Sequence, residues 1–167
     1  MEARLITLTL NGQPLQAMAE PRMHLADFLR QAAVLPSVRV SCEYGVCGCC
    51  SLLLNGEVVR GCLVLAVQAD GAEIGTLEGL NQSGAIADLQ ESFVRRNAMQ
   101  CGYCTPAMLL TAQELLAADP DPSREAVREH LSGNYCRCTG YHAIVDAVME
   151  TAATRRQAMP AKAGDAA

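Results

Sequence analysis

The chain has 167 residues, of which half are hydrophobic and 19% are charged, and its formal net charge is −5. This length fits one domain or two small ones, and an acidic chain without a cluster of lysine and arginine lacks the basic surface that nucleic acids require. We expect no membrane span, since no segment approaches about 20 apolar residues, and the N-terminus shows no signal-peptide pattern. We therefore expect a cytoplasmic protein in a reducing compartment, where cysteines serve as metal ligands more often than they form disulfides.

The start of the chain predicts a β-hairpin followed by a helix. Ile6, Leu8 and Leu10 alternate with threonines and give one apolar face. Asn11-Gly12 is a strong hairpin-turn signal, so we expect a second strand over residues 14–18. Residues 21–33 have apolar side chains at helical spacing and predict a helix.

Two further strand patterns complete the first half of the chain. Residues 51–54 and 57–67 flank Asn55-Gly56 and predict a second hairpin, and residues 73–75 predict a short strand. Hairpins around one helix indicate a small α+β domain, which we place at residues 1–80.

The hydrophobic period changes to that of helices in the second half. Ile86, Leu89 and Phe93 share one helical face, and Pro106 suits the first turn of a second helix. Ser123 can cap a third helix, and a fourth helix follows Tyr141. Four helices with short connections predict a four-helix bundle over residues 81–155, and residues 156–167 predict a disordered tail.

Three cysteines in the first half follow the spacing C-x4-C-x2-C, with a fourth twelve residues further on. Plant-type ferredoxins use this spacing to bind two irons and two sulfides. Gly45 and Gly48 let the backbone approach a cluster closely, where N–H groups can donate hydrogen bonds to sulfur. The alternative is a structural zinc site or free thiols, which the glycine pattern does not require. The first cysteine group comprises Cys42, Cys47, Cys50 and Cys62.

The second half carries four more cysteines, two before the second predicted helix and two before the last one. Helix N-termini present free N–H groups and the positive end of the dipole, which favour anionic sulfur. The spacing C-x2-C with a distant C-x-C is ambiguous by itself, and zinc is a serious alternative. The second cysteine group comprises Cys101, Cys104, Cys136 and Cys138. The ninth cysteine, Cys49, lies between two members of the first group and is predicted to be a small buried residue, with an alternative ligand or redox-sensitive thiol as the other interpretation.

The sequences CEYGVCGCC at 42–50, GCL at 61–63, QCGYCTPAM at 100–108 and GNYCRCTGY at 133–141 resemble the small iron–sulfur subunit of the molybdenum hydroxylase (xanthine oxidase/aldehyde oxidase) family. The resemblance extends from about residue 3 to residue 154. It implies an α+β fold, in which a ferredoxin-like β-grasp domain precedes a four-helix bundle, as the element patterns independently predict.

The resemblance also implies cofactors and residue roles. Each cysteine group would bind one 2Fe–2S cluster, the Cys42 group nearer the flavin and the Cys101 group nearer the molybdenum cofactor. Gln100 would contact the pterin of that cofactor, and Cys138 would lie beside the same pterin. Cys49 stands where the family commonly has Ala, and Ala107 where it commonly has Gly; neither departure removes a ligand.

The function implied is single-electron transfer inside a molybdenum-containing hydroxylase or dehydrogenase, in which this chain is a non-catalytic subunit. The implied partners are a large molybdenum-cofactor subunit and either a medium FAD-binding subunit or a cytochrome acceptor. The competing hypotheses are a freestanding ferredoxin-like shuttle and a zinc-stapled interaction module.

Overall fold

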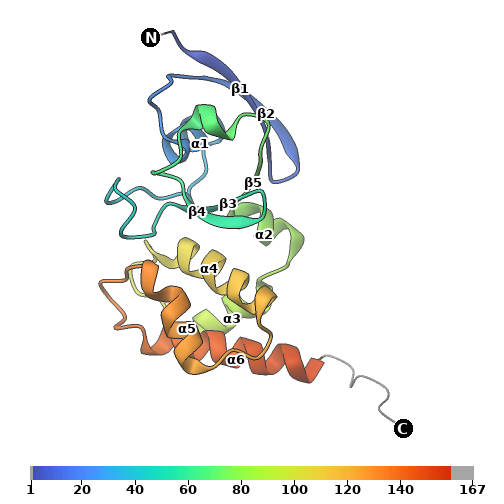
Figure 1. Cartoon of the computed structure of the whole chain (residues 1–167). Coiled ribbons are helices and arrows are strands. Elements are labelled where there is room, and N and C mark those ends of the chain that lie inside the picture. The colour runs from blue at the N-terminus through green and yellow to red at the C-terminus, as the bar shows by residue number, and fades with distance from the viewer. Residues whose placement is uncertain (1, 159–167) are drawn as a thin grey trace.

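The computed structural model describes residues 2–158. Within them the fold is mixed, with a five-stranded sheet in the N-terminal part and α-helices gathered in the C-terminal part (Figure 1). No helix among residues 2–158 combines the length and the apolar character needed to cross a bilayer.

The sheet is built from the predicted hairpins and has the strand order β2-β1-β5-β3-β4. β1 and β5 run parallel, and the other neighbouring strands are antiparallel. Ile6, Leu8 and Leu10 point into the core, as their alternation predicts. The strands are β1 (Arg4–Leu10), β2 (Gln13–Ala19), β3 (Ser51–Leu54), β4 (Glu57–Arg60) and β5 (Glu73–Gly75).

Two predicted boundaries in this half are wrong. The helix expected over 21–33 is α1 (Leu25–Ala33), because His24 has an extended backbone and its side chain caps the helix by accepting from the Asp27 N–H. The strand expected over 57–67 ends at Arg60, because the chain turns there and continues into the 3-10 helix Ala66–Ala69.

A short helix that the sequence did not suggest, α2 (Leu77–Ser83), spans the predicted domain boundary at residue 80. Its first turn is held by Glu78, which accepts from the Ser37 N–H at 3.0 Å, the Ser37 hydroxyl at 2.5 Å and the Thr76 hydroxyl at 2.6 Å. The link between the two halves is therefore tied back to the first half.

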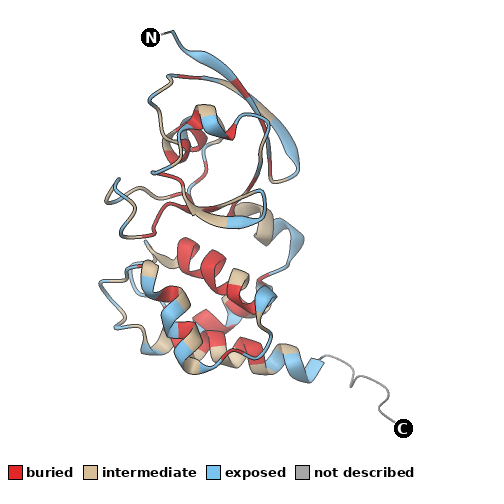
Figure 2. Cartoon of the chain, in the orientation of Figure 1, coloured by how far each residue is buried: buried red, intermediate tan, exposed pale blue. Residues whose placement is uncertain are grey.

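The remaining helices pack around a second hydrophobic core. α4 is buried along most of its length (Figure 2), because it contacts β3 and β4 on one side and helices on the other. Phe93 and Met108 lie fully inside this core. The helices are α3 (Ala87–Arg95), α4 (Thr105–Ala118), α5 (Arg124–His130) and α6 (His142–Ala158).

The predicted start of a disordered tail at residue 156 is wrong. α6 continues to Ala158, so residues 156–158 are helical, and Arg156 pairs there with Asp121. The rest of the predicted tail, residues 159–167, lies outside the described residues.

Candidate metal–sulfur centres

The loop that carries Cys42, Cys47 and Cys50 contains no helix or strand and is shaped by glycines. Gly45 and Gly48 have φ of +85° and +72°, a region that disfavours other residues. A Cβ at Gly48 would also collide with the carbonyl of Gly133, so the loop approaches the C-terminal half through bare backbone. The two glycines therefore have the unusual backbone angles expected of them, whereas their approach to a cluster stays a prediction.

Backbone N–H groups point at sulfur in this loop. The N–H of Cys47 donates to Cys42 Sγ at 3.4 Å. Burial raises the pKa of Cys42, but the N–H groups of Cys47, Tyr44 and Val46 outweigh it and lower the pKa to about 6. Burial raises the pKa of Cys50 to about 12, so this thiol needs a bound cation to become a thiolate.

The second cysteine group comes together from two separate loops. Cys101 Sγ and Cys138 Sγ are 3.6 Å apart, although 37 residues separate them in the chain. The Thr139 N–H and hydroxyl donate to Cys136 Sγ at 3.4 and 3.1 Å. Burial raises the pKa of Cys136, yet the Thr139 donors, hydroxyl first, leave it below its usual value.

The helix-terminus prediction holds for the position of Cys104 but not for its charge, because burial raises the pKa of this thiol to about 12. Cys104 immediately precedes α4, with Pro106 in the first turn. Cys136 and Cys138 lie several residues before His142, where α6 begins. In that loop Thr139, and not a helix end, supplies the sulfur-directed donors.

One cysteine of the first group shares a cavity with the second group. A cavity of about 560 Å³ is bordered by all four cysteines of the second group together with Cys47 and Cys49. Its other lining residues are Ser41, Tyr103, Tyr135, Arg137 and Tyr141. Among residues 2–158, no three cysteine, histidine or acidic side chains converge closely enough to hold a single metal ion.

Gln100 and Cys138 lie side by side, and their predicted roles beside a pterin stay predictions. The Gln100 side-chain amide donates to the Cys138 carbonyl at 3.0 Å, and both residues are exposed. Their exposure leaves them accessible to a partner molecule.

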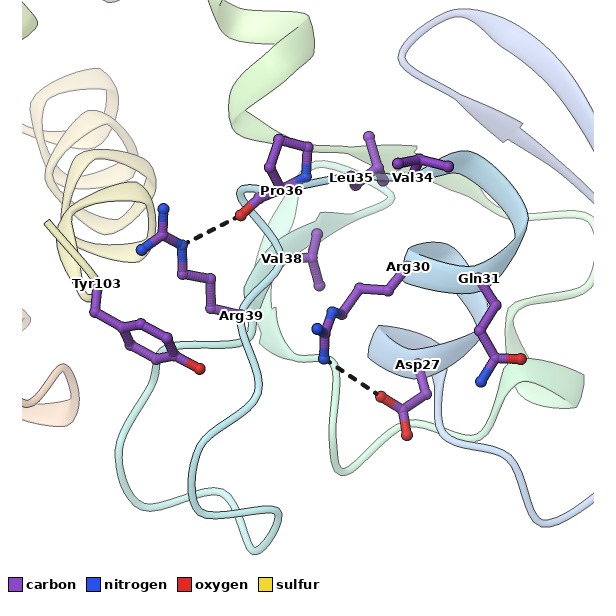
Figure 3. Close-up of a pocket in the computed structure, with 9 residues that line it drawn as sticks. All are labelled: Asp27, Arg30, Gln31, Val34, Leu35, Pro36, Val38, Arg39 and Tyr103. Atoms are coloured by element: carbon purple, nitrogen blue, oxygen red, sulfur yellow. Dashed lines mark hydrogen bonds and ion pairs between the residues drawn. The ribbon is translucent and has the colours of Figure 1, made fainter.

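A cavity of similar size, about 580 Å³, lies beside α1 and is lined by residues of α1, of the segment 34–39 and by Tyr103 (Figure 3). Arg39 lies over the Tyr103 ring, 5.1 Å from its centre, and donates to the Pro36 carbonyl at 3.2 Å. The Tyr103 hydroxyl donates to the Val40 carbonyl at 2.7 Å. Tyr103 lies between Cys101 and Cys104 in the chain. Its contacts with Arg39 and Val40 therefore connect the second cysteine group to the segment that precedes Cys42.

The spacing of the cysteines gave no indication of Arg60, Ser51 and Asn134, which join the two cysteine loops through hydrogen bonds. Arg60 and Asn134 are 74 residues apart, and no sequence pattern that we recognised relates them.

The residues present fit two iron–sulfur clusters. Donors aimed at thiolates, glycines in the first loop and a cavity lined by all four cysteines of the second group are features that such clusters need. These features define an iron–sulfur protein with two sites.

Comparison with known proteins shows the family to which this iron–sulfur protein is similar. Residues 8–76 match the 2Fe-2S iron-sulfur cluster binding domain, and residues 76–149 match the [2Fe-2S] binding domain. The nicotine 6-hydroxylase small subunit of Paenarthrobacter nicotinovorans is 48% identical over 145 residues, covering 87% of each chain. The nicotinate dehydrogenase small FeS subunit of Eubacterium barkeri is 46% identical, covering 89% of this chain and 96% of that one.

A solved structure agrees with these relatives. A chain of quinoline 2-oxidoreductase from Pseudomonas putida 86 superposes with a TM-score of 0.87 and 49% identity, covering 94% of this chain and 98% of that chain. The chain belongs to the family of iron–sulfur small subunits of molybdenum hydroxylases. It carries two 2Fe–2S binding domains and serves electron transfer as a non-catalytic subunit of an oxidoreductase.

Proposed function

We propose that the two cysteine groups are the ligand sets of two separate 2Fe–2S clusters that act in series. One set is Cys42, Cys47, Cys50 and Cys62, and the other is Cys101, Cys104, Cys136 and Cys138. When bound, each cluster takes up and gives up one electron at a time. The observation that carries the proposal is the convergence of all four cysteines of the second group on one cavity, which Cys47 of the first group also lines, with N–H and hydroxyl donors aimed at sulfur in both loops.

The contribution of this chain is to position the sulfurs and to tune their charge. The Cys47 N–H and the Thr139 donors stabilise thiolates and, with them, the extra negative charge of a reduced cluster. Burial of Cys50 and Cys62 keeps water away from the first site. The exposed Cys101 and Cys138 leave one edge of the second site open to a partner.

We assign that open edge to a large molybdenum-cofactor subunit. Gln100 and Cys138 are exposed side by side, so the Gln100 amide can bind a polar, ring-shaped group such as a pterin close to the cluster ligand Cys138. The Gln100 amide has a second N–H available after its bond to the Cys138 carbonyl.

The first site would face the electron acceptor, an FAD-binding medium subunit or a cytochrome. Tyr44 within the loop that carries this site and Leu63 next to Cys62 are 68% and 61% exposed, and Leu63 lies close to Gly45 of the same loop. Exposed apolar side chains of this kind favour a protein partner over water.

The architecture and location that we propose follow the same family pattern. Residues 1–80 form a β-grasp domain of the ferredoxin type, and residues 81–155, through α3, α4, α5 and α6, form a four-helix bundle. All nine cysteines are unpaired, which supports a reducing compartment such as the cytoplasm.

Purification of the complex from its native host tests this proposal. We expect a large molybdenum-containing chain to co-purify, with four irons and four sulfides per copy of this chain, as two 2Fe–2S clusters require. Full reduction with dithionite should give two distinct electron paramagnetic resonance (EPR) signals. Zinc in place of iron, or a single paramagnetic species, would contradict the two-cluster assignment, and a chain purifying alone with its clusters would favour a freestanding shuttle.

A further inference from the structure

The loops that carry the two cysteine groups are in direct contact. The N–H of Tyr135 donates to the Cys47 carbonyl at 2.8 Å, and Gly48 lies against the Gly133 carbonyl. Cys47 belongs to the first group, and Tyr135 precedes Cys136 of the second. One hydrogen bond therefore completes a path along the backbone from one ligand set to the other.

Arg60, the last residue of β4, spans this contact from the side. Its guanidinium donates to the Ser51 hydroxyl, directly after the first loop, and to the Gly133 carbonyl at 2.8 Å and Asn134 Oδ1 at 3.1 Å, at the start of the second loop. Ser51 in turn connects Arg60 to the first loop, because its hydroxyl donates to the Gly48 carbonyl at 2.6 Å. Ser51 and Asn134 are each 1% exposed, so water competes little for these bonds.

The shape of the side chain matters for this arrangement. A guanidinium is planar and holds its donors in a rigid fork, so that it can bind two loops at once in a fixed geometry. The ammonium of a lysine is a single point and cannot reproduce that spacing.

The charge of Arg60 is not neutralised locally. Its three hydrogen-bond partners are an uncharged hydroxyl, a carbonyl and an amide oxygen, and no ion pair of Arg60 within 4.0 Å is found in the described part of the chain. A permanent positive charge near both loops favours the reduced, more negative state of a neighbouring cluster.

We propose that Arg60 is a positioning residue for electron transfer: its fork fixes the separation of the two clusters, and its charge raises their reduction potentials. This inference rests on the proposed function, because it requires a cluster on each cysteine group. Since electron tunnelling slows steeply with distance, a clamp at the point of contact keeps the transfer between clusters fast.

The test compares wild-type complex with Arg60→Met, Arg60→Lys and, as a matched control on the far helices, Arg95→Met. Iron and sulfide content first shows whether both clusters are present, which tests the proposed function separately. The magnetic splitting between the two reduced clusters, measured by EPR, then reports their separation, and a redox titration reports each potential. Neither readout depends on turnover.

We expect Arg60→Met to decrease the splitting and lower at least one potential. Arg60→Lys should decrease the splitting but keep the potentials near those of the wild type, because it retains the charge and loses the fork. Arg95→Met should change neither. A wild-type splitting in a fully loaded Arg60→Met protein would overturn the positioning role, and unchanged potentials in that variant would overturn the role of the charge.

If Arg60→Met does not retain both clusters, Ser51→Ala decides the question of position. This change removes one of the bonded oxygens and keeps the charge. We expect a smaller splitting, and a splitting equal to that of the wild type would overturn the clamp.

Discussion

Single cysteines in this chain differ in what surrounds them, and Cys49 differs most. It is 6% exposed, and its thiol lies 4.0 Å from the Cys47 carbonyl, with its side chain on the wall of the cavity shared with the second group. We expect Cys49→Ala to keep the full iron content, whereas Cys50→Ala should lose about half of it, one of two clusters. Metal analysis of the purified variants checks this. Loss of iron from Cys49→Ala would make Cys49 a ligand.

Glu78 is a second residue with a role of its own, at the link between the halves. Burial raises the pKa of Glu78, but hydrogen bonds from Ser37 and Thr76 outweigh it and hold the pKa below its usual value. We expect Glu78→Ala to lower the free energy of unfolding by about 1–3 kcal/mol, because the partly buried donors of Ser37 and Thr76 would lose their acceptor. Denaturant titration measures the loss. Glu125→Ala, at a side chain that is 81% exposed, is the control and should stay within about 0.5 kcal/mol.

Short residue patterns predicted the turns well, but they did not predict hydrogen bonds between residues that are far apart in the chain. Asn11 and Asn55 were predicted to turn the two hairpins, and both have the positive φ that such turns need. Glu78 is bonded to Ser37, 41 residues away, and nothing in the spacing of the sequence indicates that pairing. The same holds for Arg60.

Pairs of helices are held by ion pairs at their edges, as Asp88 of α3 and Arg155 of α6 show. Arg155 donates twice to this carboxylate, at 2.7 and 2.9 Å, and this bonding lowers the pKa of Asp88. A lowered pKa in the folded state stabilises the fold above the unfolded value near 3.9, and the contribution is lost only as the pH falls through the folded value.

We therefore expect Asp88→Asn to destabilise the protein equally at pH 5 and pH 8. The side chain is 40% exposed, so solvent screening keeps the loss to about 0.5–1 kcal/mol. Unfolding free energies at the two pH values check this expectation. A loss that appears only at pH 8 would show that another group is responsible.

Adjacent residues on α3 provide a sharper test of the core. Phe93 is 1% exposed and packs in the core of the helical half, whereas its neighbour Val94 is 60% exposed. Phe93→Ala should cost about 3–5 kcal/mol through lost burial and the cavity left behind, and Val94→Ala should stay within about 0.5 kcal/mol. Equal losses in denaturant titrations would contradict this assignment of the buried face.

Elements with strong periodicity were predicted correctly, and those fixed by their surroundings were not. The helices around Phe93 and Met108 follow apolar repeats that a core imposes. α2 has few apolar residues and is held by Asn11 and Ser37 from the first half. The start of α1 was misplaced because histidine is an uncommon N-cap.

The molecule as a whole depends on contacts between its two halves that the sequence could not reveal. α4 is apolar around its circumference, which predicts burial, but not that it packs on β3. Glu114 of α4 accepts from the Val58 N–H at 2.8 Å and pairs with His130 at 3.0 Å, so one carboxylate links the sheet edge to α5. The cysteine motifs predicted two sites, whereas only the fold shows that Cys47 of the first group lines the same cavity as the second group.

Removal of the clusters should show which parts of the fold depend on bound metal and which are stabilised by the hydrophobic cores. The sheet and the helices each have a hydrophobic core made mostly of aliphatic side chains and a phenylalanine, whereas residues 41–50 and 134–141 have no helix or strand to order them. After chelation under reducing conditions, we expect amide hydrogen exchange to speed up mainly in those two loops, while β1 and α4 stay protected. Their protection should persist because backbone bonding and burial there do not involve sulfur. Loss of protection throughout the chain would instead mean that cluster binding and folding are one event, as in small metal-dependent domains.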